Sequence, residues 1–288
     1  MKQTLINSIA QLAVDAGNKI LSVYKTNDFD IKTKADGSLV TQADHAAHGT
    51  ILEGLLKLDG TSPVLSEESN ASNSEERASW KRYWLVDPLD GTAEFVDKNG
   101  EFTVNIALIE NNRPRFGVVH APLQGITYIG AHNLGAVRRD SRGERAIRCR
   151  SVRSVISNKD FLVIMESRRH AEGGANPLFK KIERKIGPFE IKRAGSSLKI
   201  CLIAEGNADF YPRLGPTSEW DTAAAHAVLE AAGGTIVDPN FKKLVYNTKK
   251  DLLNPFFFAK KVLVLYCFLD NFPTSSSITF LSSVVCIF

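Results

Sequence analysis

Two carboxylates stand three residues apart in residues 84–92, which read WLVDPLDGT. Pro88 has no N–H group and disfavours helical backbone at the residue before it. We therefore expect Asp87 and Asp90 to lie on a stiff turn that directs both carboxylates and the Leu89 carbonyl oxygen to one point. Carboxylate and carbonyl oxygens are the ligands that hard divalent cations prefer. The stretch predicts a cation site.

Gly91 and Thr92 follow these acids where a helix could begin. Their backbone N–H groups and the positive end of the helix dipole would favour a phosphate there. A hard cation beside a phosphate cradle performs metal-assisted phosphate hydrolysis. The same residue types also suit a plain surface turn. The apolar run of residues 83–86 favours the site, because it puts the acids at the carboxyl end of a buried strand.

Further acids could meet this pair in one cleft. Glu67 and Glu68 end a short strand at residues 63–65 and could complete the oxygen shell of a cation, although alone they would suit a charged loop. Asp44 and Asp221 each begin an expected helix, so each could be only an N-cap. Two like charges about 4 Å apart repel by roughly 4 kcal/mol at an effective dielectric of about 20. The cleft therefore needs cations, which two or three Mg²⁺ would supply.

Composition indicates a globular protein of one large domain or two compact subdomains, with 288 residues, 43% of them hydrophobic and 24% charged. A net charge of +4 and the lack of a basic block interleaved with aromatics argue against nucleic-acid binding. The arginines of residues 138–153 suit a solvated hairpin or loop. Four widely spaced cysteines form no disulfide or zinc pattern. Residues 2–24 have helical spacing and do not resemble a signal peptide, which indicates a cytoplasmic protein.

The remaining patterns divide the chain into two halves with a ligand crevice between them. Residues 1–150 contain an expected helix at 43–58, a polar loop at 70–81, and an antiparallel sheet formed by strands at 102–109, 115–121 and 125–129. Residues 151–258 alternate strands at 161–165 and 189–193 with helices at 176–186, 196–204 and 220–232. We expect the first half to bind metal and the second to bind substrate.

Four motifs together resemble the inositol monophosphatase superfamily of Mg²⁺-dependent, lithium-sensitive phosphatases, namely residues 40–44, 66–69, 84–92 and 220–221. The chain is most similar to its bacterial 3′(2′),5′-bisphosphate nucleotidases, which remove the 3′-phosphate of adenosine 3′,5′-bisphosphate formed in sulfate assimilation. This likeness rests on residues 94–95, 99–107, 195–199 and 211–217. It runs from about residue 5 to Phe257 and departs at Ala93, where that branch commonly has lysine. It implies an α+β fold, the layered α/β/α/β/α sandwich of the inositol monophosphatase and fructose bisphosphatase type.

The resemblance also implies roles for the site residues. Two Mg²⁺ would be held by Glu67, Asp87, the Leu89 carbonyl, Asp90 and Asp221, and a third, weaker Mg²⁺ would bind near Glu67. The catalytic residues would be Glu67, Thr92 and Asp44. Of these, Thr92 and Asp44 would orient and deprotonate the attacking water. The nucleotide bisphosphate would contact Glu67, Asp90, Gly91, Thr92, Ser196, Ser197, Lys199, Arg213 and Asp221, with His170 and Tyr211 as weaker candidates. Apart from the family resemblance, residues 195–199 would suit a plain helix cap, and Arg213 would suit a position on the surface.

The tail at residues 259–288 does not resemble the family's ending, in which one last strand finishes the chain soon after Phe257. Its longest strongly apolar stretch, residues 262–269, is far short of the ~20 residues that a membrane helix needs. We interpret the tail as a translated frameshift or a misassembled gene end, which would remove the final strand and leave a sheet edge bare. Peripheral contact with the inner face of the cytoplasmic membrane and the oligomeric state stay open.

Other functions also stay open at this point. An inositol monophosphatase or a sugar bisphosphatase would share the fold, and the abnormal tail could leave an inactive or merely nucleotide-binding protein.

Overall fold

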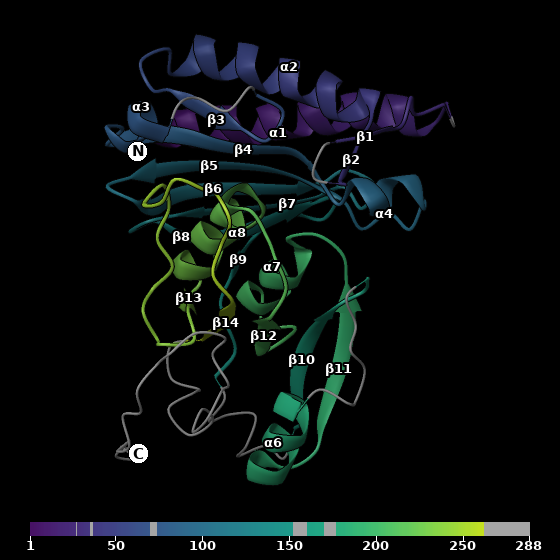
Figure 1. Ribbon diagram of the computed structural model, residues 1–288, viewed down its shortest axis with the longest axis vertical. Coiled ribbons are helices and arrows are strands. Elements are labelled where there is room, and N and C mark those ends of the chain that lie inside the picture. Colours follow the sequence, from purple (N-terminus) through teal and green to yellow (C-terminus); the bar gives the residue numbers. More distant parts are fainter. Residues whose placement is uncertain (27, 35–36, 70–73, 152–159, 170–176, 262–288) are drawn as a thin grey trace.

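The computed structural model describes residues 1–26, 28–34, 37–69, 74–151, 160–169 and 177–261. Figure 1 shows them stacked in layers. Helices α1 (Gln3–Tyr24) and α2 (Gln42–Leu58) cover one face of a seven-stranded sheet, and α7 (Leu198–Ala204) and α8 (Glu219–Ala231) cover the other. A five-stranded sheet lies below these two helices, and α6 (Pro177–Ile186) covers its far face. The α+β fold with a layered α/β/α/β/α sandwich is confirmed.

The seven-stranded sheet runs in chain order, which keeps its connections short. Its strands are β3 (Val64–Ser66), β4 (Arg82–Asp90), β5 (Thr103–Glu110), β6 (Arg113–Ala121), β7 (Ile126–Ala131), β8 (Gly135–Asp140) and β9 (Gly143–Ile147). The pairs from β4 to β9 are antiparallel, as predicted for the three strands β5, β6 and β7, while β3 is parallel to β4. The first part of the arginine-rich stretch, residues 138–147, lies in the β8–β9 hairpin. Because β3 and β4 are parallel, their carboxyl ends meet at the same edge of the sheet.

Several short elements complete this half. Strands β1 (Lys32–Thr33) and β2 (Leu39–Val40) pair with each other, and α4 (Thr92–Val96) follows β4. Helix α3 (Ser74–Ala78) lies within the stretch 70–81, which we expected to be a loop. That expectation was wrong for these residues, because the acids of their first turn favour the positive end of a helix.

The five-stranded sheet is mixed rather than purely parallel. Its spatial order is β11 (Phe189–Ala194), β10 (Leu162–Ser167), β12 (Phe210–Arg213), β14 (Phe257–Lys261) and β13 (Gly234–Val237). Strand β10 is parallel to β11 and β12, whereas β14 is antiparallel to β12 and β13. Residues that follow α8 therefore return into the middle of this sheet.

Strand β14 corrects the expectation of a missing final strand and a bare sheet edge. Phe257 pairs with Arg213 and Phe258 with Val237, so β14 fills the place between its neighbours. The strand lacks the alternation of apolar and polar residues by which we searched for strands, because four successive residues of it are buried. Lys260 is one of them, with its ammonium group 5.6 Å from the centre of the Phe241 ring. The frameshift interpretation of residues 262–288 lies outside the described residues. Among the helices that the structure describes, none is long and apolar enough to cross a membrane.

Three apolar cores fill the spaces between the layers. Strand β4 alternates between two of them, since Trp84 faces the core under α1 and α2 while Tyr83 faces the core around α8. Helix α8 lies very close to β6 and β7. A Cβ atom on Gly117 would lie 2.2 Å from the Ala224 carbonyl oxygen, so only glycine permits this approach. The close packing holds the middle of α8 against the sheet.

Candidate active site

The first site residues lie on a bulge at the end of β4. Asp87 pairs with Asn105 and Asp90 with Thr103, so three steps along β4 oppose two along β5. Pro88 explains the irregularity, because it has no N–H group to donate to a neighbouring strand. Strand β4 thus continues to Asp90, and the stiff turn that we expected is a bulge within the strand.

A cluster of carboxylates surrounds this bulge. Oxygen atoms of Glu67, Asp87 and Asp221 lie within 4.8 Å of one another. Burial raises the pKa of Asp87 well above its ordinary value, and the charges of Glu67 and Asp90 raise it further. The Oδ2 atom of Asp87 is buried without a hydrogen-bond partner among the described residues, while its Oδ1 accepts the Leu89 N–H at 3.1 Å. An unpartnered carboxylate oxygen that faces two further carboxylates fits a divalent cation.

The topology explains how Glu67 reaches Asp87. Strand β3 pairs Ser66 with Val86 in parallel, and the next residue, Glu67, donates its N–H to the Val86 carbonyl oxygen at 3.1 Å. The two carboxylates therefore extend from neighbouring strand ends. Asp221 approaches from the opposite side, on the first turn of α8.

Lys34 is a functional candidate that we did not predict. Its ammonium group donates to Glu67 Oε1 at 2.7 Å and to Glu68 Oε1 at 2.5 Å. These pairs raise the pKa of Lys34 against the opposing effect of burial. The lysine stands more than thirty residues from these acids in the sequence, and no motif in the sequence points to it. It neutralises part of the negative charge of the cluster.

Asp44 and Asp221 each occupy the third position of a helix rather than the N-cap, which was the alternative interpretation of both residues. The N-caps are Thr41 for α2 and Ser218 for α8, and both helices have a capping box. Asp44 Oδ2 accepts the Thr41 N–H at 2.8 Å and the Thr41 hydroxyl at 2.7 Å. Asp221 Oδ2 accepts the Ser218 N–H at 2.8 Å. The preceding polar residues cap the helices, and the acids support them.

Thr92 connects Asp44 to the cluster. Its hydroxyl donates to Asp44 Oδ1 at 3.1 Å and also lies 3.3 Å from the Leu89 carbonyl oxygen. Burial raises the pKa of Asp44, although its hydrogen bonds with Thr41 oppose the shift. Gly91 has φ of 88°, in the left-handed region that favours glycine. Helix α4 has only five residues, so an anion there would be held by N–H groups more than by a helix dipole.

The stretch 195–199 forms another wall of the site. Asp90 Oδ2 accepts the Ser197 N–H at 2.6 Å, and the Ser197 hydroxyl bonds to Asn105 Oδ1 at 2.8 Å. The Ser197 hydroxyl therefore forms its hydrogen bond with a buried protein group. Lys199 donates to the Ser196 carbonyl oxygen at 2.6 Å and lies 5.3 Å from the centre of the Tyr211 ring. Burial lowers the pKa of Lys199 to about 8, although Asp90 opposes this effect.

These residues share one cavity of about 490 Å³. The predicted site residues that line it are Glu67, Asp87, Leu89, Asp90, Gly91, Thr92, Ser196, Ser197, Lys199, Arg213 and Asp221, together with Tyr211. Asp44 lies behind the wall and reaches the cavity through Thr92. His170 lies outside the described residues. Arg169 and Glu94 also line the cavity, and we did not predict them as site residues.

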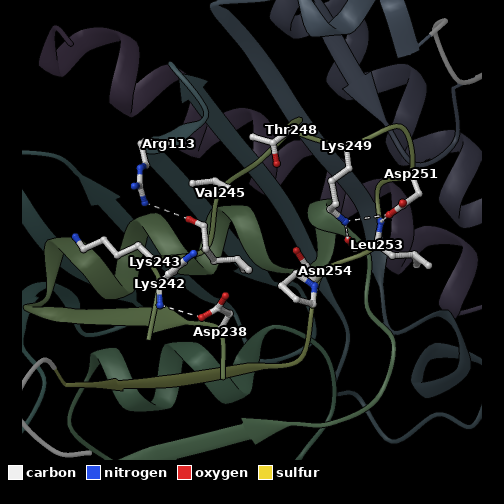
Figure 2. Close-up of a pocket in the computed structure, with 12 residues that line it drawn as sticks. Arg113, Asp238, Lys242, Lys243, Val245, Thr248, Lys249, Asp251, Leu253 and Asn254 are labelled. Atoms are coloured by element: carbon white, nitrogen blue, oxygen red, sulfur yellow. Dashed lines mark hydrogen bonds and ion pairs between the residues drawn. The ribbon is translucent and has the colours of Figure 1, made fainter. Parts of the chain in front are cut away.

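A second cavity, of about 780 Å³, lies under the segment 238–255 and beside Arg113 (Figure 2). Lys249 in its wall pairs with Asp251 at 2.9 Å, as the dashed line in Figure 2 shows. The predicted site residues do not line this cavity. Its wall instead supports α8, because the Asn254 side chain donates to the Ser218 carbonyl oxygen at 2.7 Å.

Comparisons with known proteins agree with this geometry. The family model described as "Inositol monophosphatase family" matches residues 1–263. The 3′(2′),5′-bisphosphate nucleotidase CysQ of Escherichia coli (strain K12) is 45% identical over 254 residues, which cover 88% of this chain and 98% of that protein. CysQ of Haemophilus influenzae is 35% identical over 260 residues, or 89% of this chain and 93% of that protein.

A solved structure extends the likeness to three dimensions. The crystal structure of CysQ from Bacteroides thetaiotaomicron, described as a bacterial member of the inositol monophosphatase family, has a TM-score of 0.77 and 38% identity. The match covers 88% of this chain and 97% of that one. The chain belongs to the inositol monophosphatase family.

Proposed function

We propose that this chain is a 3′(2′),5′-bisphosphate nucleotidase that removes the 3′-phosphate of adenosine 3′,5′-bisphosphate and leaves AMP. The bisphosphate nucleotidases that resemble it at up to 45% identity support this substrate. The observation that carries the proposal is the cluster of Glu67, Asp87 and Asp221 in the wall of a cavity that also contains cationic side chains. Acids that would hold a metal and cations that would hold a charged nucleotide thus face the same space.

Glu67, Asp87, the Leu89 carbonyl oxygen, Asp90 and Asp221 would hold two Mg²⁺ ions, with a third near Glu67. Bound Mg²⁺ lowers the pKa of water and stabilises negative charge on a leaving oxygen. Asp90 also has a positioning role, because its Oδ2 accepts the N–H of Ser197. Lys34 would keep Glu67 and Glu68 neutralised whenever less metal is bound.

Thr92 and Asp44 would prepare the attacking water. The Thr92 hydroxyl donates its hydrogen to Asp44, so its lone pairs are left to accept a hydrogen bond from water. As water loses its proton to Thr92, Asp44 Oδ1 can take the proton that Thr92 gives up. Thr41 holds the other oxygen of Asp44, which fixes the carboxylate in the orientation for this transfer.

The nucleotide would lie against the cationic wall. The N–H groups of Gly91 and Thr92 would bind the phosphate that is removed, and Ser196, Lys199 and Arg213 would hold the rest of the nucleotide. Ser197 would act through Asp90, since its hydroxyl bonds to buried protein groups.

Cellular location and division into halves also belong to the proposal. The described cysteines Cys149 and Cys201 are free and buried, which fits a reducing cytoplasm. Residues 1–150 would supply most metal ligands and residues 151–258 most nucleotide contacts, with Asp221 crossing from the second half to the first.

Phosphate release by the purified full chain tests the proposal. With Mg²⁺ we expect adenosine 3′,5′-bisphosphate to be hydrolysed at the 3′ position faster than inositol 1-phosphate or fructose 1,6-bisphosphate. Chelation should abolish the reaction, and the Asp87→Asn variant should stay inactive when Mg²⁺ is restored. Preference for either of the other substrates would assign the chain to another branch of the family. Failure to hydrolyse any of the three substrates would contradict the proposal.

A further inference from the structure

Arg169 bridges the two sides of the cavity. It follows β10, yet its Nη2 donates to the Ala93 carbonyl oxygen of α4 at 2.9 Å. Its Nε lies 3.4 Å from Glu94 Oε1, and its guanidinium group also pairs with Asp97. Ala93, Glu94 and Arg169 all line the cavity. The positive charge at this part of the wall therefore comes from β10, while position 93 on α4 carries none.

Arg169 differs from the other cationic groups of the cavity in its exposure. Lys199 and Arg213 are buried and donate to the carbonyl oxygens of Ser196 and Pro216. The Arg169 side chain keeps 40% of its surface exposed, and its partner Asp97 keeps 60%. Exposed ion pairs contribute little to stability, so an incoming anion can replace Asp97 at small cost.

We propose that Arg169 makes the site prefer a nucleotide with two phosphates, by binding the phosphate that is not hydrolysed. This inference rests on the proposed function, because it needs one phosphate at the carboxylate cluster. The guanidinium group offers paired donors that match a phosphate, which gives a charge-assisted contact. Without Arg169, a second phosphate would face the carboxylates of Glu94 and Asp97 uncompensated. A singly phosphorylated nucleotide would lack that charge and would be affected less.

Direct binding measurements separate this role from a structural one. Calorimetric titration with saturating Mg²⁺, in chains that also carry Asp44→Asn to slow hydrolysis, would compare adenosine 3′,5′-bisphosphate with adenosine 3′-monophosphate, which lacks only the 5′-phosphate. For Arg169→Ala we expect about a tenfold loss of affinity for the bisphosphate and less than about a threefold loss for the monophosphate. Adding Ala93→Lys to Arg169→Ala should restore part of the difference, because it returns a positive charge to the same wall. Asp97→Asn should tighten bisphosphate binding about twofold, since it removes a competing carboxylate.

Arg168 provides a matched control. It is the neighbouring arginine, it pairs with Glu101 through contacts of 2.6 and 2.7 Å, and it does not line the cavity. Arg168→Ala makes the same change in net charge, so it should alter the affinity for both nucleotides by the same factor. Equal losses of affinity for both nucleotides in Arg169→Ala would overturn the inference. It would also be overturned if Arg168→Ala lost affinity for the bisphosphate relative to the monophosphate as strongly as Arg169→Ala does.

The same titrations keep the two hypotheses distinct. If the wild-type chain binds the bisphosphate but does not hydrolyse it with Mg²⁺, the proposed function fails while the affinity ratios still judge Arg169. If hydrolysis occurs, and the ratio of the affinities for bisphosphate and monophosphate is the same in Arg169→Ala as in the wild type, only the inference about Arg169 fails.

Discussion

The first turns of α2 and α8 use the same local structure to place an aspartate in two different surroundings. In each, a hydroxyl residue caps the helix and an aspartate at the third position accepts the backbone N–H of the cap. Asp44 directs its other oxygen to the Thr92 hydroxyl, whereas an oxygen of Asp221 lies within 4.8 Å of Glu67 and Asp87 oxygens. The helix start orients each carboxylate, and in the proposed mechanism its surroundings determine whether it would accept a proton or hold a cation.

Electrostatics distinguishes the two aspartates further. Burial is the largest cause that raises both pKa values, but Asp221 is also raised by the charges of Asp90 and Glu67. The charge of Glu68 also raises the pKa of Asp44, while hydrogen bonds from Thr41 and Thr92 lower it. For Asp221 the Ser218 N–H and the charge of Arg213 lower the pKa. The comparison teaches that both carboxylate oxygens of Asp44 accept hydrogen bonds from protein hydroxyl groups, whereas Asp221 faces two further carboxylates, an arrangement that fits a cation.

The largest expected effect is at α8. Asp221→Asn keeps a side-chain acceptor for the Ser218 N–H, so the helix should stay capped. The substitution removes one negative charge from the carboxylate cluster. We expect kcat with saturating Mg²⁺ to fall by on the order of a thousandfold, equivalent to about 4 kcal/mol of transition-state stabilisation. Thermal unfolding in EDTA should show an intact fold. A variant with kcat within tenfold of the wild type would remove Asp221 from the metal site.

A smaller loss is expected at α2. Asp44→Asn keeps an acceptor for Thr41 but cannot take a proton from Thr92, so kcat should fall by roughly a hundredfold. The affinity for Mg²⁺, measured by calorimetry, should change little, in contrast to that of Asp221→Asn. If Asp44→Asn instead weakened Mg²⁺ binding as much as Asp221→Asn does, the two helix starts would not have different roles.

The pH dependence of stability gives a further contrast. The pKa values of Asp87 and Asp221 are raised in the folded state, so this state binds more protons than the unfolded chain at pH values between the ordinary and raised pKa. Their contribution to the free energy of unfolding is therefore complete below about pH 4 and is lost as the pH rises through the raised values. In EDTA, urea unfolding should show a less negative dependence on pH for Asp87→Asn than for the wild type. Identical slopes would show that the cluster is not under electrostatic strain.

The caps themselves should have the smallest effects. Thr41→Ala and Ser218→Ala should each lower the free energy of unfolding by about 1 kcal/mol, the usual cost of losing a helix cap. Thr41→Ala should also lower kcat several-fold, because its hydroxyl donates to Asp44 Oδ2 at 2.7 Å. Ser218→Ala keeps the backbone N–H that binds Asp221, so its kcat should change less than twofold. The reverse order of activities would contradict the difference between the helix starts.

The layered fold was predictable because motifs and apolar runs mark most of its elements. The end of β4 in particular combines a buried run, a proline and two acids, and parallel pairing with β3 brings Glu67 to it. The starts of α2 and α8 were predicted to within one residue, but the residue that caps each helix was not, since sequence patterns leave helix boundaries uncertain by about one or two residues. Lys34 and Arg169 depend on contacts between distant segments, to which no local pattern points.

Strand β14 shows a different limit. A lysine within a strand suggests a polar end, but the buried Lys260 places its aliphatic stem in the sheet and its ammonium group by an aromatic ring. Residue type alone therefore could not show where the final strand stops.

Anomalous diffraction from crystals of the chain grown with Mn²⁺ would test the central claim most directly, namely that Glu67, Asp87 and Asp221 together hold a divalent cation. We expect an anomalous peak at about 2.0–2.2 Å from an oxygen of Asp87 and from at least one of the other two carboxylates. The Asp87→Asn variant should lack that peak under the same conditions. If crystals of the active protein showed their only anomalous peak away from these three residues, the account would be contradicted. Crystals of Asp87→Asn that kept the peak would contradict it as well.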